Sequence, residues 1–119
     1  MANITEILNQ LMTTDGSIAS AVVDSDSGLM LGAAGSGIDL ELAAAGNTEV
    51  VRAKLKTMAS LGLTDSIDDI LITLNKQYHI IKLHPAQHGL FIYFVLDKAK
   101  ANLALARRAT VTAADNLKL

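Results

Sequence analysis

Apolar residues recur with helical spacing at the start of the chain. Between Asn3 and Thr14 they fall at positions 4, 7, 8, 11 and 12, the stripe of an amphipathic helix. Asn3 followed by Glu6 favours a capping-box start, and Gly16 suits a left-handed helix end. The pattern therefore predicts a first helix that packs one face against a core.

The next apolar segments are shorter and are separated by turn residues. Ser17 to Val23 and Gly28 to Ala34 flank the polar turn Asp24 to Ser27, which is typical of a β-hairpin. After the break Gly35-Ser36-Gly37, helical spacing predicts a long helix from Asp39 to Leu61.

The second half of the chain predicts three strands and a closing helix. The strands are expected at 67–74, 78–83 and 90–96, and the helix at 98–117 with Leu103, Ala106, Ala113 and Leu117 on its buried face. The strand at 90–96 has no polar alternation, so both of its faces should be covered. The element order predicts an α/β domain spanning residues 1–119, with one five-stranded antiparallel sheet, helices on both faces and the order α-β-β-α-β-β-β-α.

Composition narrows the class of protein. The chain has 119 residues and no cysteine, which fits one domain and excludes disulfides and thiolate metal sites. No basic and apolar leader opens the sequence and no apolar run approaches about 18 residues, so a cytoplasmic protein without a membrane span is expected. Ten basic against twelve acidic residues argue against nucleic acid as a partner.

The surface should be unusually apolar. Charged residues make up 18% of the chain and the mean hydropathy is +0.34. A lone globule of this composition would have difficulty covering itself with polar side chains. We therefore expect self-association.

Two loops resemble ligand-binding motifs but lack their defining residues. A calcium loop beginning at Asp24 would need glycine at Leu29 and an acid at Gly35. A phosphate loop at Gly35-Ser36-Gly37 would need lysine at Ile38 and a hydroxyl residue at Asp39. A hairpin turn and a strand-to-helix break are the better interpretations, and no cofactor or metal is expected.

The titratable residues do not assemble into a catalytic motif. His79 belongs to a strand, and His84 and His88 flank a proline in a loop without a nearby acid. Asp65, Asp68 and Asp69 are better explained by solvation before a strand. An enzyme using His84 and His88 with Asp97 is the weakest alternative, so the protein is expected not to be an enzyme.

Small side chains and arginines suggest contact surfaces instead. Ala43 to Gly46 open the long helix with small residues, which suit close packing on the sheet or against a second copy whose third strand pairs edge to edge. The basic side chains of the last helix form either a solvated face or a docking strip for an acidic partner.

Several strings in this order resemble the roadblock (dynein-light-chain-like) family, which also occurs in bacteria. They are Val22-Val23-Asp24 with Gly28-Leu29-Met30, Ile67 to Thr73 leading to Tyr78-His79-Ile80-Ile81, and Asn102 to Arg107. The resemblance covers nearly the whole chain. It implies a profilin-like fold, dimerisation through the second helix and third strand, and a non-catalytic platform for small Ras-like GTPases that in some bacterial members stimulates GTP hydrolysis.

The resemblance leads to the following expectations. The protein would be a homodimeric regulator or scaffold that binds a Ras-like GTPase; the alternative is a nucleotide-independent dimeric adaptor in a signalling or cytoskeletal assembly. The expected dimer or partner interface consists of Ala43, Ala44, Asn47, Val51, Leu55, Ile70 and Ile72. Arg52, Arg107 and Arg108 are the candidate partner-docking residues.

Overall fold

A computed structural model describes residues 3–119 and contains three helices and five strands within them. The elements are α1 (Ile4–Leu11), β1 (Ser17–Asp24), β2 (Leu29–Gly35), α2 (Leu40–Ser60), β3 (Asp69–Thr73), β4 (Gln77–Leu83), β5 (Leu90–Asp97) and α3 (Leu103–Asn116). The predicted element order is confirmed. No helix in residues 3–119 is both long and apolar enough to cross a membrane.

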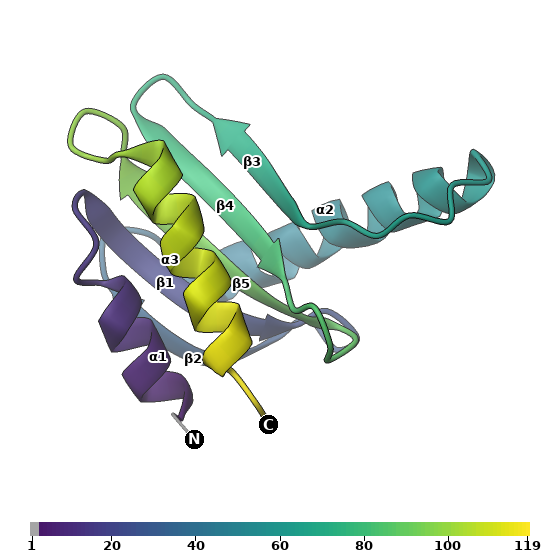
Figure 1. Cartoon of the computed structure of the whole chain (residues 1–119), viewed down its shortest axis with the longest axis horizontal. Coiled ribbons are helices and arrows are strands. Elements are labelled where there is room, and N and C mark those ends of the chain that lie inside the picture. Colours follow the sequence, from purple (N-terminus) through teal and green to yellow (C-terminus); the bar gives the residue numbers. More distant parts are fainter. Residues whose placement is uncertain (1–2) are drawn as a thin grey trace.

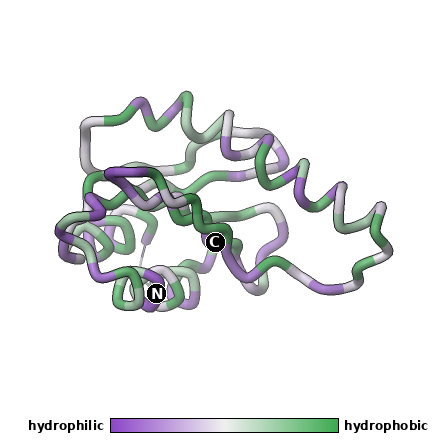
Figure 2. The backbone as a smooth tube through the Cα atoms, turned by 90° about the horizontal axis from the view of Figure 1, so that it is seen from above, coloured by the Kyte–Doolittle hydropathy of each residue, from purple (hydrophilic) through white to green (hydrophobic). Residues whose placement is uncertain are grey.

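The strands form one antiparallel sheet in the order β2-β1-β5-β4-β3. β5 is central and is buried from Leu90 to Leu96, as its unbroken apolar run predicted. Figure 2 shows the resulting layers, with α2 on one side of the sheet and α1 and α3 on the other. β2 and β3 are left as the two edge strands.

Each face of the sheet has its own hydrophobic core. Alternation along the strands sends Ile80, Ile92 and Phe94 towards α1 and α3, and Ile81, Phe91 and Tyr93 towards α2. The α1 side is closed tightly: a Cβ on Gly32 of β2 would lie 2.4 Å from Cγ2 of Ile4. Glycine at this position therefore lets α1 approach the sheet edge.

The last helix begins at Leu103 and not at Lys98, which corrects the sequence-based boundary. The backbone N–H groups of Lys100 and Ala101 donate to the Asp97 carbonyl, which closes a turn after β5. Asn102 is the helix cap, and its Oδ1 accepts from the Leu105 N–H at 3.1 Å. Lys98 therefore lies in a turn and not at a helix start.

The third strand is shorter than predicted. It begins at Asp69 and ends at Thr73, whereas the apolar pattern suggested residues 67–74. Pairing with β4 starts where Asp69 faces Lys82 and ends where Thr73 faces Tyr78. The extent of the backbone pairing, and not the hydrophobic pattern, sets these limits.

Candidate functional site

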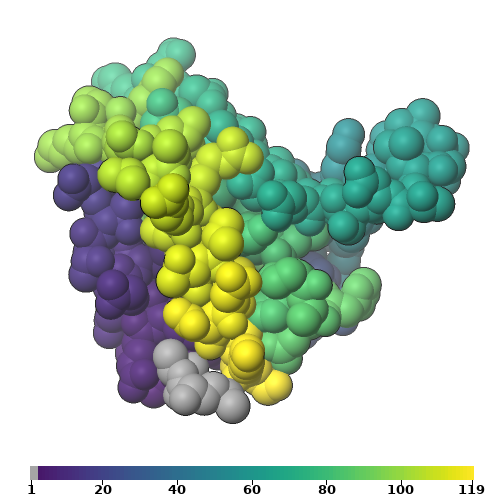
Figure 3. Space-filling model, in the orientation of Figure 1, coloured from purple at the N-terminus to yellow at the C-terminus, as the bar shows by residue number. Residues whose placement is uncertain are grey.

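The long helix α2 is only partly covered by its own sheet. Its N-terminal half packs on β1 and β2, and its C-terminal half projects past the sheet (Figure 1). In the space-filling view this end and the loop after it stand out as an arm (Figure 3). Apolar side chains are exposed along this part of the chain: Val50 (38%), Leu55 (39%), Leu61 (66%) and Leu63 (52%).

The predicted interface residues of α2 fall into two groups. Ala44 and Val51 are buried in the core beneath the helix, where they contact the chain's own sheet. Ala43 and Asn47 are half-buried, and Leu55 is exposed. Within the single chain, Leu55 is thus the most accessible of the five to a second molecule.

The edge strand β3 is the second feature that the chain leaves uncovered. It pairs with β4 alone, so one row of its backbone N–H and C=O groups has no strand partner within residues 3–119. Ile70 packs against the α2-side core, and Ile72, two residues on, lies on the same face; both are half-buried. Ile70, Ile72 and Leu55 are hereafter called the α2–β3 surface.

A polar network lies beside the α2–β3 surface. The Tyr93 hydroxyl is 2.9 Å from Nδ1 of His79, and Nε2 of His79 is 2.8 Å from Oε1 of Gln77. Because the amide oxygen only accepts, Nε2 carries the proton and Nδ1 accepts from Tyr93. The rings meet edge to face, with centroids 5.5 Å apart. Because burial favours the uncharged ring, this arrangement fits the neutral tautomer that is protonated at Nε2.

Burial governs the titration of this network. It lowers the pKa of His79 and raises that of Tyr93; a hydrogen bond from Asn47 partly opposes the second shift. The sequence placed His79 on a strand but gave no sign of its contact with Tyr93. The contact with Tyr93 could have been found only from the pairing of β4 with β5. In that pairing Ile81 lies opposite Tyr93, and His79, two residues before Ile81, lies on the same face of the sheet.

Of the three candidate docking arginines, two are engaged within the chain. Nη2 of Arg52 donates to the Asp26 carbonyl at 2.7 Å, and Nη1 lies 3.4 Å from Glu49. Arg107 forms a two-pronged ion pair with Asp69, with contacts of 2.9 and 2.7 Å. Arg108 forms no ion pair with the described residues and remains exposed.

The two loops that resemble ligand motifs have structural roles. The Asp24 carboxylate accepts from the Asp26 N–H at 3.0 Å and from the Ser27 hydroxyl at 3.1 Å. Gly28 closes this hairpin turn with a φ of 78°. Asp39 caps α2 by accepting from the Leu42 N–H at 3.1 Å.

The histidines do not form a catalytic group with Asp97. Nδ1 of His84 accepts from the Ala86 and Gln87 N–H groups, and Nε2 lies 2.6 Å from the Leu117 carbonyl. Asp97 lies at the far end of β5, about 24 Å along an extended strand from Leu90, where the histidine loop ends. Among residues 3–119, no three His, Asp or Glu side chains gather in a way that could hold a metal ion.

Structural comparison places this arrangement among known folds. No protein-family model matches the sequence, and no curated protein sequence matches it. The chain is similar to a roadblock/LC7 domain from Streptomyces avermitilis, with a TM-score of 0.82, 11% identity, and coverage of 96% of this chain and 93% of that one. It is also similar to Myxococcus xanthus MglB, with a TM-score of 0.79, 18% identity, and coverage of 94% and 91%.

A further similar structure is described as MglB with a tetrameric arrangement. It aligns with a TM-score of 0.80 and 16% identity over 93% of this chain and 82% of that one. All three alignments span nearly the whole domain at low sequence identity, so the likeness lies in the path of the backbone. The chain therefore has the fold of the roadblock/LC7 domains, as its sequence resemblance implied.

Proposed function

We propose that the protein is a cytoplasmic, non-catalytic homodimer that binds a small Ras-like GTPase and regulates or scaffolds it. The observation that carries the proposal is that two features of the chain are left uncovered. They are the open edge of β3 and the projecting half of α2, which exposes Leu55. The fold shared with MglB and the roadblock/LC7 domain supports the same class of protein.

The surfaces that β3 and α2 leave uncovered support the proposed dimer. Unpaired backbone groups along an edge strand are a template for another strand. The projecting half of α2 exposes Leu55, and a helix segment without tertiary packing is only marginally stable in water. A second copy related by a two-fold axis would pair β3 with β3 and bring each helix arm over the partner's Ile70 and Ile72.

The dimer interface is tested with Leu55→Asp. A carboxylate buried against a second copy would be desolvated without a partner, so the variant should be monomeric at micromolar concentration where the native chain is dimeric. Light scattering coupled to size exclusion measures the mass. Leu29→Asp is the matched control, since Leu29 is 64% exposed on the opposite edge strand β2. A Leu55→Asp protein that remains dimeric would remove this interface.

Ala44→Arg is a poor substitute for this test. Ala44 is 1% exposed and contacts the chain's own sheet, so arginine there would disrupt the monomer as well as any dimer. Leu55 separates the two effects because its side chain is already partly in solvent.

The GTPase partner is tested by affinity capture from the source organism's lysate. Parallel captures contain a non-hydrolysable GTP analogue or GDP, and mass spectrometry identifies the bound proteins. The proposal expects a Ras-like GTPase in one nucleotide state only. Recovery of one non-GTPase partner in both states would instead establish the adaptor alternative.

Stimulated hydrolysis, if the captured GTPase shows it, is tested on the arginines. Arg108 is the first candidate because Arg52 and Arg107 are already bound within the chain. Arg108→Ala should lower the single-turnover rate of GTP hydrolysis, while Lys100→Ala, an exposed substitution in the turn before α3, should not. An unchanged rate in each arginine variant would exclude a direct arginine contribution.

A further inference from the structure

His79 is a half-buried titratable side chain that lies beside the α2–β3 surface. In the pairing of β4 with β3 it lies directly opposite Ile72, so both side chains are on the same face of the sheet. The Cβ atoms of such a pair are about 5 Å apart. A second molecule that covers Ile72 would therefore cover the imidazole of His79 as well.

The ring of His79 has no acidic partner within residues 3–119. Its two nitrogen atoms contact the Tyr93 hydroxyl and the side-chain amide of Gln77, and neither group carries a negative charge. The ion pairs of the described chain do not include the imidazole. A positive charge on the ring would therefore depend on water for its solvation.

The elements packed on this face of the sheet contribute uncharged side chains around His79. β3 contributes Ile70 and Ile72, and β5 contributes Val95 and the Tyr93 phenol, whose raised pKa keeps it neutral. α2 adds four buried side chains, all uncharged: Leu40, Ala44, Thr48 and Val51. This environment favours the neutral form of the ring.

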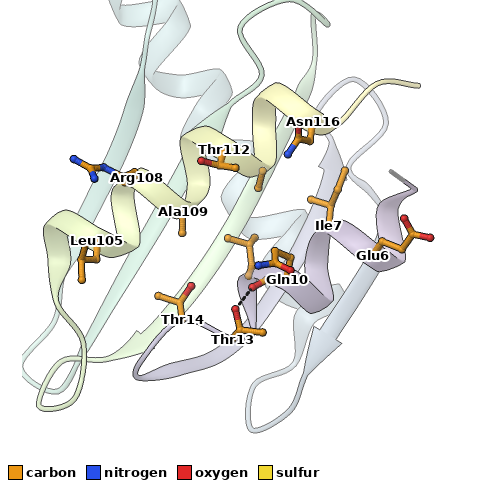
Figure 4. Close-up of a pocket in the computed structure, with 12 residues that line it drawn as sticks. Glu6, Ile7, Gln10, Thr13, Thr14, Leu105, Arg108, Ala109, Thr112 and Asn116 are labelled. Carbon is orange, nitrogen blue, oxygen red and sulfur yellow. Dashed lines mark hydrogen bonds between the residues drawn. The ribbon is translucent and has the colours of Figure 1, made fainter. Parts of the chain in front are cut away.

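The charged residues of the neighbouring elements are engaged or face away. Asp97 ends β5 on this face, and its carboxylate accepts from a backbone N–H of the following turn at 2.9 Å. Lys82 of β4 is three positions from the ring and lies on the opposite face, as strand alternation requires. Glu6 and Arg108 line a groove between α1 and α3, also on the other side of the sheet (Figure 4). None of these charges is hydrogen-bonded to the ring.

The element that a second copy would bring to this edge is basic. The helical part of the projecting arm, residues 50–60, carries Arg52, Lys54 and Lys56 and no acid. All three side chains are exposed, and only Arg52 is paired, with the preceding Glu49. In the proposed dimer a protonated imidazole would lose water and gain positive neighbours. Both effects oppose association.

We propose that His79 makes the dimer sensitive to pH: the neutral imidazole permits association through the α2–β3 surface, and the protonated imidazole opposes it. The inference rests on the dimer proposed above and names the group that regulates it. It differs from an effect on folding, because the second copy excludes the proton in addition to the chain's own core.

Burial sets the direction of the pH dependence. Burial within one chain lowers the pKa of His79, and covering by a second copy would lower it further. The separate chains therefore take up protons at a higher pH than the dimer does. Affinity is complete above the pKa of the separate chains and declines as the pH falls through it. Two-fold symmetry places two such rings in each dimer, so dissociation takes up two protons.

The test is the dimer dissociation constant of the full chain, measured by analytical ultracentrifugation at pH 7.5 and 5.5. The native constant should rise roughly tenfold at the lower pH, and that of His79→Gln should stay nearly constant. His88→Gln is the matched control, since His88 is exposed in the loop between β4 and β5, and it should keep the native dependence. His79→Leu replaces the ring by an uncharged side chain if the glutamine variant fails to fold.

Circular dichroism at each pH separates dissociation from unfolding. A native dimer with the same dissociation constant at both values would overturn the role of His79 and leave the dimer in place. An equal rise in the native chain and in His79→Gln, or dissociation that coincides with loss of secondary structure, would overturn it too. A native chain that is monomeric at pH 7.5 up to 100 µM would instead remove the dimer itself, and this inference with it.

Discussion

At the scale of single residues, the buried hydroxyl of Ser20 is an unpaired polar atom. Ser20 lies on β1 with 0% exposure, and its Oγ has no hydrogen-bond partner within the described chain. A desolvated hydroxyl without a partner costs free energy that a methyl group does not. We expect Ser20→Ala to raise the free energy of unfolding by about 1 kcal/mol in urea titrations. A loss of stability would show that the hydroxyl is satisfied.

His79 makes stability depend on pH. Burial lowers its pKa from the ordinary value of 6.5, so the unfolded chain takes up the proton at a higher pH than the folded chain does. Stability from the neutral ring is therefore complete above about pH 6.5 and declines as the pH falls below it. A proton on Nδ1 would also end its acceptance from the Tyr93 hydroxyl.

The matched variant is His79→Gln, which keeps an acceptor on the β4 strand. Between pH 7.5 and 5.5 the native chain should lose more of its free energy of unfolding than the variant. His84 and His88 are present in both proteins, so their contributions cancel in the comparison. Equal losses would exclude His79 as the titrating group.

At the scale of elements, two ion pairs hold the start of β3. Arg107 of α3 bonds both carboxylate oxygens of Asp69, whose side chain is 12% exposed. The buried ammonium of Lys82 lies 2.5 Å from Asp68 and, by donating to it, lowers the pKa of that exposed carboxyl. These contacts fix where the edge strand leaves the loop after α2.

Arg107→Ala should destabilise the chain by about 1–2 kcal/mol, because it leaves the Asp69 carboxylate largely buried without its partner. Arg108→Ala, one position along, should change stability by less than about 0.5 kcal/mol since Arg108 makes no ion pair in the described chain. Hydrogen exchange should be faster at Asp69 and Ile70 in the first variant only. Equal effects of both variants would contradict this role for Arg107.

At the scale of the whole molecule, self-association should contribute to stability. If β3 and the α2 arm are covered only in a dimer, folding is coupled to association and the midpoint of thermal unfolding rises with protein concentration. We expect a clear rise in Tm between 1 and 100 µM for the native chain, by a few degrees. The Leu55→Asp variant should show a Tm independent of concentration, and a native Tm without concentration dependence would argue against an obligate dimer.

The local pattern of residues was enough to establish the elements and their order. Helical spacing marked α1 and α2, and the unbroken apolar run at Leu90 to Leu96 correctly indicated a strand covered on both faces. The boundaries of β3 and α3 differ from those that the pattern predicted. The predicted start of α3 at residue 98 was too early, because residues 98–101 form a backbone turn on the Asp97 carbonyl and Asn102 caps the helix.

Local sequence signals were sufficient to predict the fold class, because hydrophobic periodicity, caps and turn residues act over a few positions and agree with one another. Tertiary structure decided which side chains are available for contact. Ala44 and Leu55 share a helical pattern, yet one faces the chain's own sheet and the other projects beyond it. Arg107 and Arg108 are neighbours, yet only the first reaches Asp69, 38 residues away in sequence. Such differences depend on where the chain returns in space, which no local pattern encodes.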